Sequence, residues 1–406
     1  FFAVILLVLL GIGLAAIMFS GANTDTNQGG DNNTPIEVPQ TLVGLKDPAT
    51  AAQYSLIGVR ADDTLAVVDP ENNAEIVVSL EHRNWVKPTW SPDGKLIAVL
   101  ATAEGVEDDI EKVLDLYVYE LEKAEWTQIT NYAATGTGID GYDWLDETRL
   151  VFTQGASGSH WLHRYDYVNK ELRKEFLAAG KLLYAELVSQ RFILGEYDAS
   201  GNITGYQVFG FNGKMAEEFA SSTFGESLTI QNLILGRSED ELVFVALAGE
   251  QRRYLLWNFS SPTPREMNLN VETIIASLQP GADTPVADSN SVVDTNLHRT
   301  LLCSAGSSGY YYVVEKEDPE NVFSLRALDL TQDGYLSKES IDIVAEKATG
   351  AYPQFLSRCG EDSALLGVVE LGEGDQNEIR WYLVSVDTHK LKSIPVATNY
   401  VDLQLK

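Results

Sequence analysis

Two short serine-rich segments are the first places to look for nucleophilic chemistry. Gly155 to Ser159 reads GASGS, and Ala305 to Gly309 reads AGSSG. Neither is a true G-x-S-x-G, and neither is followed by an amphipathic helix, whereas a nucleophile elbow places its serine on a strand-to-helix turn. The sequence therefore assigns no catalytic residue and favours a protein that is not an enzyme.

Histidine and cysteine are too few and too scattered to indicate a metal site. The chain has five histidines and two cysteines. His160 and His163 are the only close pair, and a spacing of three places them on opposite faces of a strand, so we interpret them as surface imidazoles. Cys303 and Cys359 fall at similar places in adjacent units of the chain. Two buried thiols are the favoured interpretation, and a disulfide is the alternative.

One segment resembles a calcium-binding loop in its spacing. It runs from Asp329 to Ser340 and reads DLTQDGYLSKES. The twelfth position, where a bidentate Glu is expected, is Ser340. Asp-Gly within it is also the signal of a hairpin turn. We therefore predict a turn without calcium, and the sequence calls for no metal and no cofactor.

Acidic side chains are the strongest chemical signal in the sequence. The chain has 59 Asp and Glu against 29 Lys and Arg, for a formal net charge of -30. This excess argues against nucleic acid as a partner, because phosphate binding needs a basic surface. The acids gather in a few short stretches. Whether those stretches form one surface depends on the elements that carry them.

A repeat supplies these elements. Its clearest unit, Pro88 to Thr130, contains a strand ending at Trp90, the turn SPDG, an apolar strand, an acidic loop, and the strands DLYVYEL and EWTQIT. The apolar strand LIAVLA is hydrophobic on both faces, so both faces must be covered. The same order of strands recurs, in degraded copies, as far as Val396. The sequence thus predicts stacked four-stranded sheets.

The first unit of the repeat lacks one strand. Tyr54 to Leu80 supplies three strands, and the segment VDLQL from Val401 is a single strand left over at the other end. Each completes the other. We predict an all-β fold, a β-propeller of seven four-stranded blades closed by the C-terminal strand, with six or eight blades as alternatives.

The clearest unit resembles a known family. WSPDGKLIAVLA followed by DLYVYEL and WTQIT resembles the TolB-type, WD40-like propeller repeat. The motif matches closely over about 40 residues, and the other units share its spacing only. The resemblance implies an envelope or secreted protein that binds other proteins. A similar repeat also forms the non-catalytic propeller of some serine peptidases, so the fold leaves function open.

The N-terminal region predicts a link to a membrane. Residues 1–19, FFAVILLVLLGIGLAAIMF, are uncharged and long enough for a bilayer span, so we predict a membrane anchor or signal segment. Residues 20–47 are poor in large apolar residues and are predicted to be a disordered linker. Residues 48–406 would form the propeller on the extracytoplasmic, for example periplasmic, side. Cleavage after Ala22 is the alternative and would give a secreted protein.

Loops that join the second and third strands of each blade emerge on one face of a propeller. In the incomplete first unit, the next unit and the last unit, these loops are acidic, and ring closure makes the three units neighbours. The loops in the middle units are neutral or basic and include Arg252 and Arg253. The predicted acidic sector consists of Asp62, Asp63, Glu104, Glu107, Asp108, Asp109, Glu370, Glu373 and Asp375.

This sector would attract a basic protein partner or cations. The sequence therefore favours a membrane-tethered extracytoplasmic β-propeller that acts as a protein-binding or scaffolding module, with its partner in the cell envelope. The alternative is an enzyme or a carbohydrate-binding propeller that uses the central pocket.

Overall fold

The computed structural model describes most of the chain from Tyr54 onward and one short segment before it. The described residues are 36–38, 54–78, 84–102, 113–132, 136–156, 159–186, 190–198, 203–220, 229–235, 241–248, 251–258, 264–267, 269, 297–305, 310–317, 322–329, 341–342, 348–349, 354–359, 363–371, 377–385, 387–395 and 400–405. Two compact units divide the chain, the first at residues 1–39, 98–119 and 126–230, and the second at 40–97, 120–125 and 231–406.

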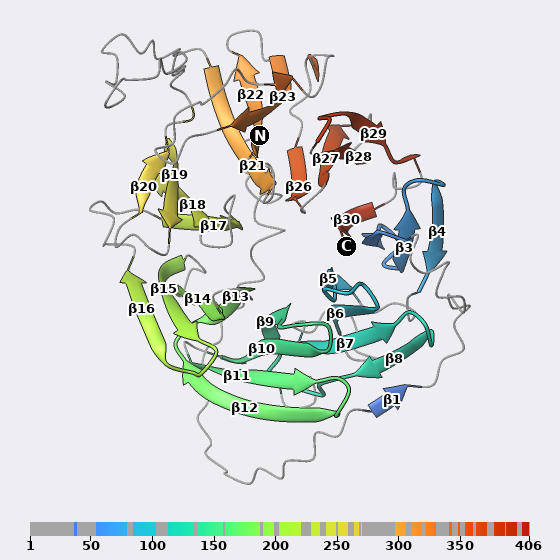
Figure 1. The fold of residues 1–406 in the computed structure, drawn as a ribbon, viewed down its shortest axis with the longest axis vertical. Helices are drawn as coiled ribbons and strands as arrows, with labels where there is room; N and C mark the ends of the chain where they lie inside the picture. The colour runs from blue at the N-terminus through green and yellow to red at the C-terminus, as the bar shows by residue number, and fades with distance from the viewer. Residues whose placement is uncertain are drawn as a thin grey trace, which may run out of the picture. The chain divides into compact units, whose positions relative to one another are not determined.

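Antiparallel sheets make up the described part of the chain (Figure 1). In one sheet, β1 (Ile36–Val38), β5 (Val86–Trp90), β6 (Leu96–Thr102), β7 (Leu114–Glu120) and β8 (Glu125–Gln128) have the order β1-β8-β7-β6-β5. In the next, β9 (Ile139–Trp144), β10 (Arg149–Ala156), β11 (Ser159–Asp166) and β12 (Glu171–Ala178) have the order β12-β11-β10-β9.

The longest sheet has eight strands. They are β13 (Lys181–Glu186), β14 (Arg191–Tyr197), β15 (Ile203–Gly210), β16 (Met215–Ala220), β17 (Thr229–Leu235), β18 (Glu241–Ala248), β19 (Gln251–Asn258) and β20 (Arg265–Met267). Its two halves each repeat the four-strand order, and β15 and β17 pair at Ile203 and Ile230.

Three further sheets complete the described fold. One has the order β30-β2-β3-β4 and contains β2 (Leu56–Arg60), β3 (Leu65–Asp69), β4 (Ala74–Val77) and β30 (Tyr400–Leu405). A second contains β21 (Leu297–Ala305), β22 (Tyr310–Glu317), β23 (Val322–Asp329), β24 (Ile341–Asp342) and β25 (Ala348–Thr349). The last contains β26 (Gln354–Cys359), β27 (Ser363–Leu371), β28 (Asn377–Ser385) and β29 (Leu391–Ser393).

The fold is an all-β propeller, as predicted, but the favoured count of seven blades was wrong, and the count found over the described residues is six, one of the two alternatives. Over the residues described, the strands form six sheets and not seven. The physical reason is the pairing of Ile203 with Ile230, which joins two consecutive four-stranded repeats into the eight-stranded sheet. Backbone pairing of this kind leaves no mark on the side-chain pattern from which the repeats were counted.

The prediction that the C-terminal strand completes the first unit of the repeat is confirmed. β30 pairs antiparallel with β2, from Leu56 opposite Leu405 to Arg60 opposite Tyr400. Tyr400 and Leu403 are buried in a cluster that also contains Trp381 of β28. The indole Nε1 of Trp381 donates to the carbonyl oxygen of Tyr400 at 3.1 Å. Tyr400 in turn donates its hydroxyl to Oε2 of Glu75 on β4 at 2.6 Å.

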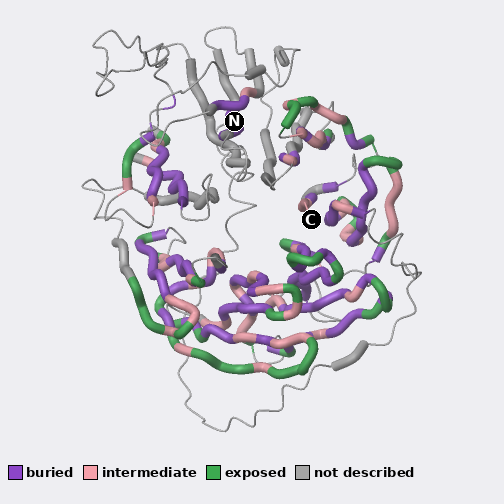
Figure 2. Tube along the Cα trace, viewed as in Figure 1, coloured by how far each residue is buried: buried purple, intermediate pink, exposed green. Residues whose placement is uncertain are grey.

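The two-faced apolar strand behaves as its sequence predicts. All seven residues of β6 are buried, and so are all five of β3. Figure 2 shows buried residues along the inner strands and exposed residues along the turns and along β12. In the first compact unit, the sheet β9–β12 packs on β13–β15 through a buried cluster that includes Val151, Leu162, Leu182 and Phe192.

The turn SPDG is held by its own side chains. Ser91 donates its hydroxyl to Oδ1 of Asp93 at 2.8 Å and accepts the backbone N–H of Leu96 at 3.0 Å. Gly94 has φ +67°, a conformation that favours glycine. These residues therefore specify the turn between β5 and the buried apolar strand β6.

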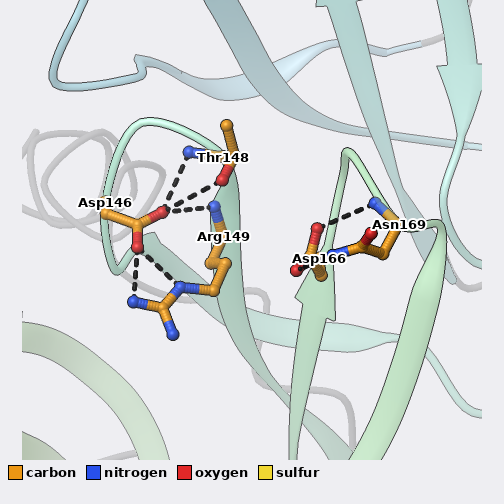
Figure 3. A network of polar contacts seen from close by, with 5 residues as sticks. All are labelled: Asp146, Thr148, Arg149, Asp166 and Asn169. Atoms are coloured by element: carbon orange, nitrogen blue, oxygen red, sulfur yellow. Dashed lines mark hydrogen bonds and ion pairs between the residues drawn. The ribbon is translucent and has the colours of Figure 1, made fainter.

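Degraded copies keep the same turn chemistry with other residues. In the β9–β10 turn, Oδ1 of Asp146 accepts the backbone N–H groups of Thr148 and Arg149, and Oδ2 accepts Nε of Arg149 at 2.6 Å (Figure 3). In the β11–β12 turn, Asp166 accepts the backbone N–H and the side-chain amide of Asn169, at 2.9 and 2.8 Å (Figure 3). The feature that these turns share is an Asp whose carboxylate accepts the backbone N–H of a residue two or three positions later.

The second half of the motif has a structural role as well. Asp115, the residue that begins DLYVYEL, is fully buried. Its Oδ1 accepts the hydroxyl of Thr130 at 2.8 Å and the backbone N–H of Tyr132 at 2.6 Å. Thr130 also accepts the N–H of Leu116 at 2.9 Å. The motif thus ties the chain leaving β8 back to β7.

The predicted anchor lies outside the described residues, and so does most of the predicted linker. No helix in the part of the chain that the structure describes is long and apolar enough to cross a membrane. Ile36–Val38, which fall within the predicted linker, pair with β8 as a short strand.

Candidate binding surface

Two acids of the predicted acidic sector are described, and both make contacts within the chain. Asp62 lies in the β2–β3 turn, where its Oδ1 accepts the hydroxyl of Thr64 at 2.6 Å and its Oδ2 lies 3.7 Å from Nη1 of Arg60. The hydrogen bond from Thr64 lowers the pKa of Asp62, with a smaller effect from Arg60. Its side chain is 56% exposed, so the carboxylate stays accessible to a partner.

Asp63 next to it serves the fold. Its carboxylate accepts the backbone N–H groups of Asn84 and Trp85, at 2.6 and 3.1 Å. These two residues lie just before β5, so Asp63 fixes the path of the chain into the next sheet. A carboxylate with two backbone donors is less available to a ligand than sequence position alone suggested.

The other acids of the sector cannot be placed from described side chains. Glu104, Glu107, Asp108 and Asp109 lie outside the described residues, as do Glu373 and Asp375, and only the backbone of Glu370 is described, in β27. The sector therefore remains a prediction. Of the two predicted basic residues, Arg252 is exposed on β19, and Nε of Arg253 lies 3.6 Å from Oε1 of Glu266.

The interpretation of His160 and His163 as surface imidazoles was wrong. Both are buried, at 4% and 5% exposure. They do point to opposite faces of β11, as their spacing predicts, since His160 contacts Asp140 while His163 stacks on Phe152 with ring centroids 5.1 Å apart. Both faces of this sheet are covered, so alternation along β11 does not separate solvent from core.

His160 belongs to a polar group inside the first compact unit. Its Nδ1 lies 2.6 Å from Oδ2 of Asp140, at ion-pair distance but without the alignment of a hydrogen bond. Oδ1 of Asp140 accepts the hydroxyl of Thr153 at 2.6 Å, and Thr153 accepts the backbone N–H of Leu182 at 2.9 Å. The group thus connects β9, β10 and β11 to β13 and has the character of an inter-sheet link.

His163 has no hydrogen-bond partner for either ring nitrogen. Burial, with a smaller effect from the charge of Lys174, lowers its pKa to about 4. An imidazole that is hard to protonate in the folded state makes stability depend on pH.

We expect the free energy of unfolding to fall between pH 6.5 and pH 4 because of His163. Its pKa is lower in the folded protein than in the unfolded chain, so the unfolded chain binds the proton first and is favoured as the pH falls. The contribution is fully present above pH 6.5 and amounts to about 3 kcal/mol lost by pH 4. Urea unfolding of His163→Phe across this range should show a shallower decline than the wild type. Parallel profiles would assign the whole decline to carboxylates.

An exposed apolar and cationic patch lies on β11 and β12. Trp161 and Leu177 are direct partners across the two strands, with 36% and 52% exposure. Nζ of Lys174 lies 3.6 Å from the centroid of the Trp161 ring, as a cation–π contact. We call these three residues the Trp161 patch. A large aromatic ring and a leucine that remain exposed together on a blade surface are the kind of group that protein interfaces bury.

Two ion pairs lie on the same two strands. Nε of Arg164 lies 3.3 Å from Oε1 of Glu175, and Arg173 donates to both carboxylate oxygens of Glu171 at 2.9 Å. Within the patch itself, the charged group is the ammonium of Lys174 over the indole. The sequence did not reveal the patch, because none of its residues belongs to a turn or a motif. Their exposure depends on how the sheet is covered, which a sequence pattern does not give.

Within the described part of the chain, no group of three or more His, Cys, Asp or Glu residues is arranged to hold a metal ion. The calcium-like loop lies outside the described residues apart from Asp329, the last residue of β23. The side chains of Cys303 and Cys359, on β21 and β26, are not described.

Comparison with known proteins gives structural neighbours and no sequence family. No protein-family model matches the chain, and no curated protein matches it either. The β-propeller domain of the Trilobed protease from Pyrococcus furiosus matches with a TM-score of 0.49 and 14% identity over 84% of this chain and 90% of that one. A prolyl endopeptidase matches with a TM-score of 0.42 and 12% identity over 87% of this chain, which spans about half, 52%, of that protein.

TolB from Acinetobacter baumannii is also among the matches, with a TM-score of 0.37 and 10% identity over 82% of this chain and 61% of that one. Likeness at this level concerns the fold alone, and the activities of these proteins remain theirs. The chain is an all-β propeller protein, and TolB is one of its structural neighbours.

Proposed function

We propose that this chain is a membrane-tethered, extracytoplasmic β-propeller that binds another protein of the cell envelope. The observation that carries the proposal is the Trp161 patch, in which an indole, a leucine and a lysine stay exposed side by side on paired strands. The uncharged segment at residues 1–19 supports the membrane tether.

The composition of the patch argues for protein rather than nucleic acid or solvent. Trp is among the residues that contribute most to protein interfaces, and here its neighbours Leu177 and Lys174 add apolar area and one positive charge. Trp161 lies on a strand that is anchored in the core, since Leu162 and Tyr165 of β11 are fully buried. A rigid, exposed aromatic loses little conformational entropy on binding.

Replacing Trp161 with Ala should abolish most partner binding. A photoreactive residue placed at Leu177 of the full chain should cross-link to one protein in envelope membranes, and Trp161→Ala should weaken that cross-link about tenfold or more, the effect expected of an interface hot spot. Cross-linked species are separated by gel and identified by mass spectrometry.

Val168 provides the matched control. It is 68% exposed in the β11–β12 turn and lies outside the Trp161 patch. A photoreactive residue there should capture little, and Val168→Ala should leave the cross-link from position 177 unchanged. Equal capture from both positions, or full capture with Trp161→Ala, would assign binding to another surface.

The acidic sector is proposed as a second, electrostatic part of the same function, one that speeds the encounter with a basic partner. Changing Glu107, Asp108 and Asp109 to their amides should reduce the association rate and weaken its dependence on salt near 0.1 M. Stability should change little, because exposed loop charges contribute little to folding. Stopped-flow or biosensor association rates at several salt concentrations provide the measurement.

The control acids must not hold ion pairs. Glu171 and Glu175 are unsuitable, because they pair with Arg173 and Arg164. Glu122, Glu147 and Asp387 are exposed turn residues and serve as the matched triple. The same slowing from both triples would mean that net charge alone matters.

A further inference from the structure

The outer edge of β8 carries a strand from the N-terminal part of the chain. β1 pairs antiparallel with it, so that Ile36 faces Gln128 and Val38 faces Trp126. Trp126 and Thr127 are buried, at 2% and 7% exposure, which fixes β8 within its own sheet. What β8 offers to β1 is therefore its backbone edge, and the sheet has gained a fifth strand there.

Prolines limit this added strand at both ends. Pro35 precedes Ile36, and Pro39 follows Val38. Proline has no backbone N–H to donate and is excluded from the interior of paired strands. The ladder thus stops at the three residue pairs that the structure shows. At about 0.5–1.5 kcal/mol net for each hydrogen bond, such a short ladder opens readily.

The connection after β1 is long enough to let the strand leave its own β8. Fifteen residues, 39–53, separate Val38 from Tyr54. At no more than about 3.6 Å for each residue, they can span roughly 50 Å. β1 of one copy can therefore reach the β8 edge of another copy without any change within the sheets.

We propose that the outer edge of β8 is a strand-docking site, and that two copies of this chain exchange Ile36–Val38 across it to form a strand-swapped dimer. The same backbone bonds form within one copy or between two, so concentration decides between the arrangements. Covalent linkage holds a strand near its own β8 at an effective concentration on the order of mM, and exchange increases as the copies are concentrated. This inference is independent of the Trp161 patch and of the membrane anchor.

Two variants of the full chain, each with one added cysteine, test the exchange. One carries Ile36→Cys and the other Gln128→Cys, each with its own affinity tag, and the two are mixed in detergent and treated with a short bifunctional thiol reagent. Residues directly opposite on an antiparallel pair have Cβ atoms about 5 Å apart, within reach of such a reagent. A cross-link between the two tags above the background from Cys303 and Cys359 requires that the strand is exchanged.

Ile36→Cys mixed with Glu125→Cys is the out-of-register control, since three residues of β8 separate Glu125 from Gln128 by about 10 Å. The wild type reports any background from Cys303 and Cys359. We expect the mixed cross-link between positions 36 and 128 to exceed the control about tenfold and to rise with protein concentration. No mixed cross-link while the double variant Ile36→Cys with Gln128→Cys cross-links within one chain would overturn the exchange. Equal cross-linking of position 36 to positions 125 and 128, or none from any variant, would overturn the docking site itself.

Discussion

Deletion of Tyr400 to Lys406 should leave a chain that no longer unfolds in one cooperative transition, or one that melts more than about 10 °C below the wild type. The deletion removes β30, whose Tyr400 and Leu403 are buried at 1% and 0% exposure. Each such side chain contributes about 1.5–3 kcal/mol through burial. Trp381 also loses the carbonyl that accepts its indole N–H, and β2 becomes an unpaired edge. Circular dichroism during heating measures the effect.

A point variant separates this effect from simple truncation. Leu403→Ala should cost about 2–5 kcal/mol, the usual range for a leucine removed from a packed core. Lys390→Ala, in the exposed β28–β29 turn, is the control and should lie within about 0.5 kcal/mol of the wild type. A deletion variant with an unchanged melting curve would show that β30 does not stabilise the sheet β30-β2-β3-β4.

Asp115→Ala should be the most damaging single substitution of a polar residue in the motif, with a loss of about 3–5 kcal/mol in the free energy of unfolding. It would leave the hydroxyl of Thr130 and the backbone N–H of Tyr132 without the carboxylate that accepts both. Each buried donor left unsatisfied costs about 1–3 kcal/mol. The shift of the urea midpoint at constant slope gives the measurement.

Thr130→Val and the double variant complete a thermodynamic cycle. Since Asp115 and Thr130 share one hydrogen bond, the two losses should be less than additive. Glu122→Ala, an exposed residue in the β7–β8 turn, is the control and should have little effect. A cost below about 1 kcal/mol for Asp115→Ala would mean that the aspartate was selected for something other than this contact.

The turns and the closing strand could be predicted from sequence because their causes are local. Ser91, Asp93 and Gly94 specify their turn through bonds that span at most five residues. The closing strand could be predicted because the first unit of the repeat has three strands and a single strand is left at the other end. The pairing of β2 with β30 completes that unit.

The features that the sequence did not reveal depend on contacts between sheets. The joining of two repeats rests on one backbone pair, Ile203 with Ile230. The burial of His160 and His163 depends on what covers each face of β11, and the strand HWLHRYDY has polar residues on both. The exposure of Trp161 is the same problem reversed, since an aromatic residue on a strand is expected in the core.

The pairing of β30 with β2 also bears on how the order of strands in the gene relates to the fold. Leu405 lies opposite Leu56 in an antiparallel pair, so the end of β30 adjoins the start of β2. That is the geometry of a hairpin, and a short loop there would close the backbone of the propeller into a circle. New ends could then be opened at a turn such as that between β11 and β12, where Val168 and Asn169 are exposed. Circular permutation of residues 54–406, which omits β1, would change which strand is made first while leaving the strands from β2 to β30 with their present partners.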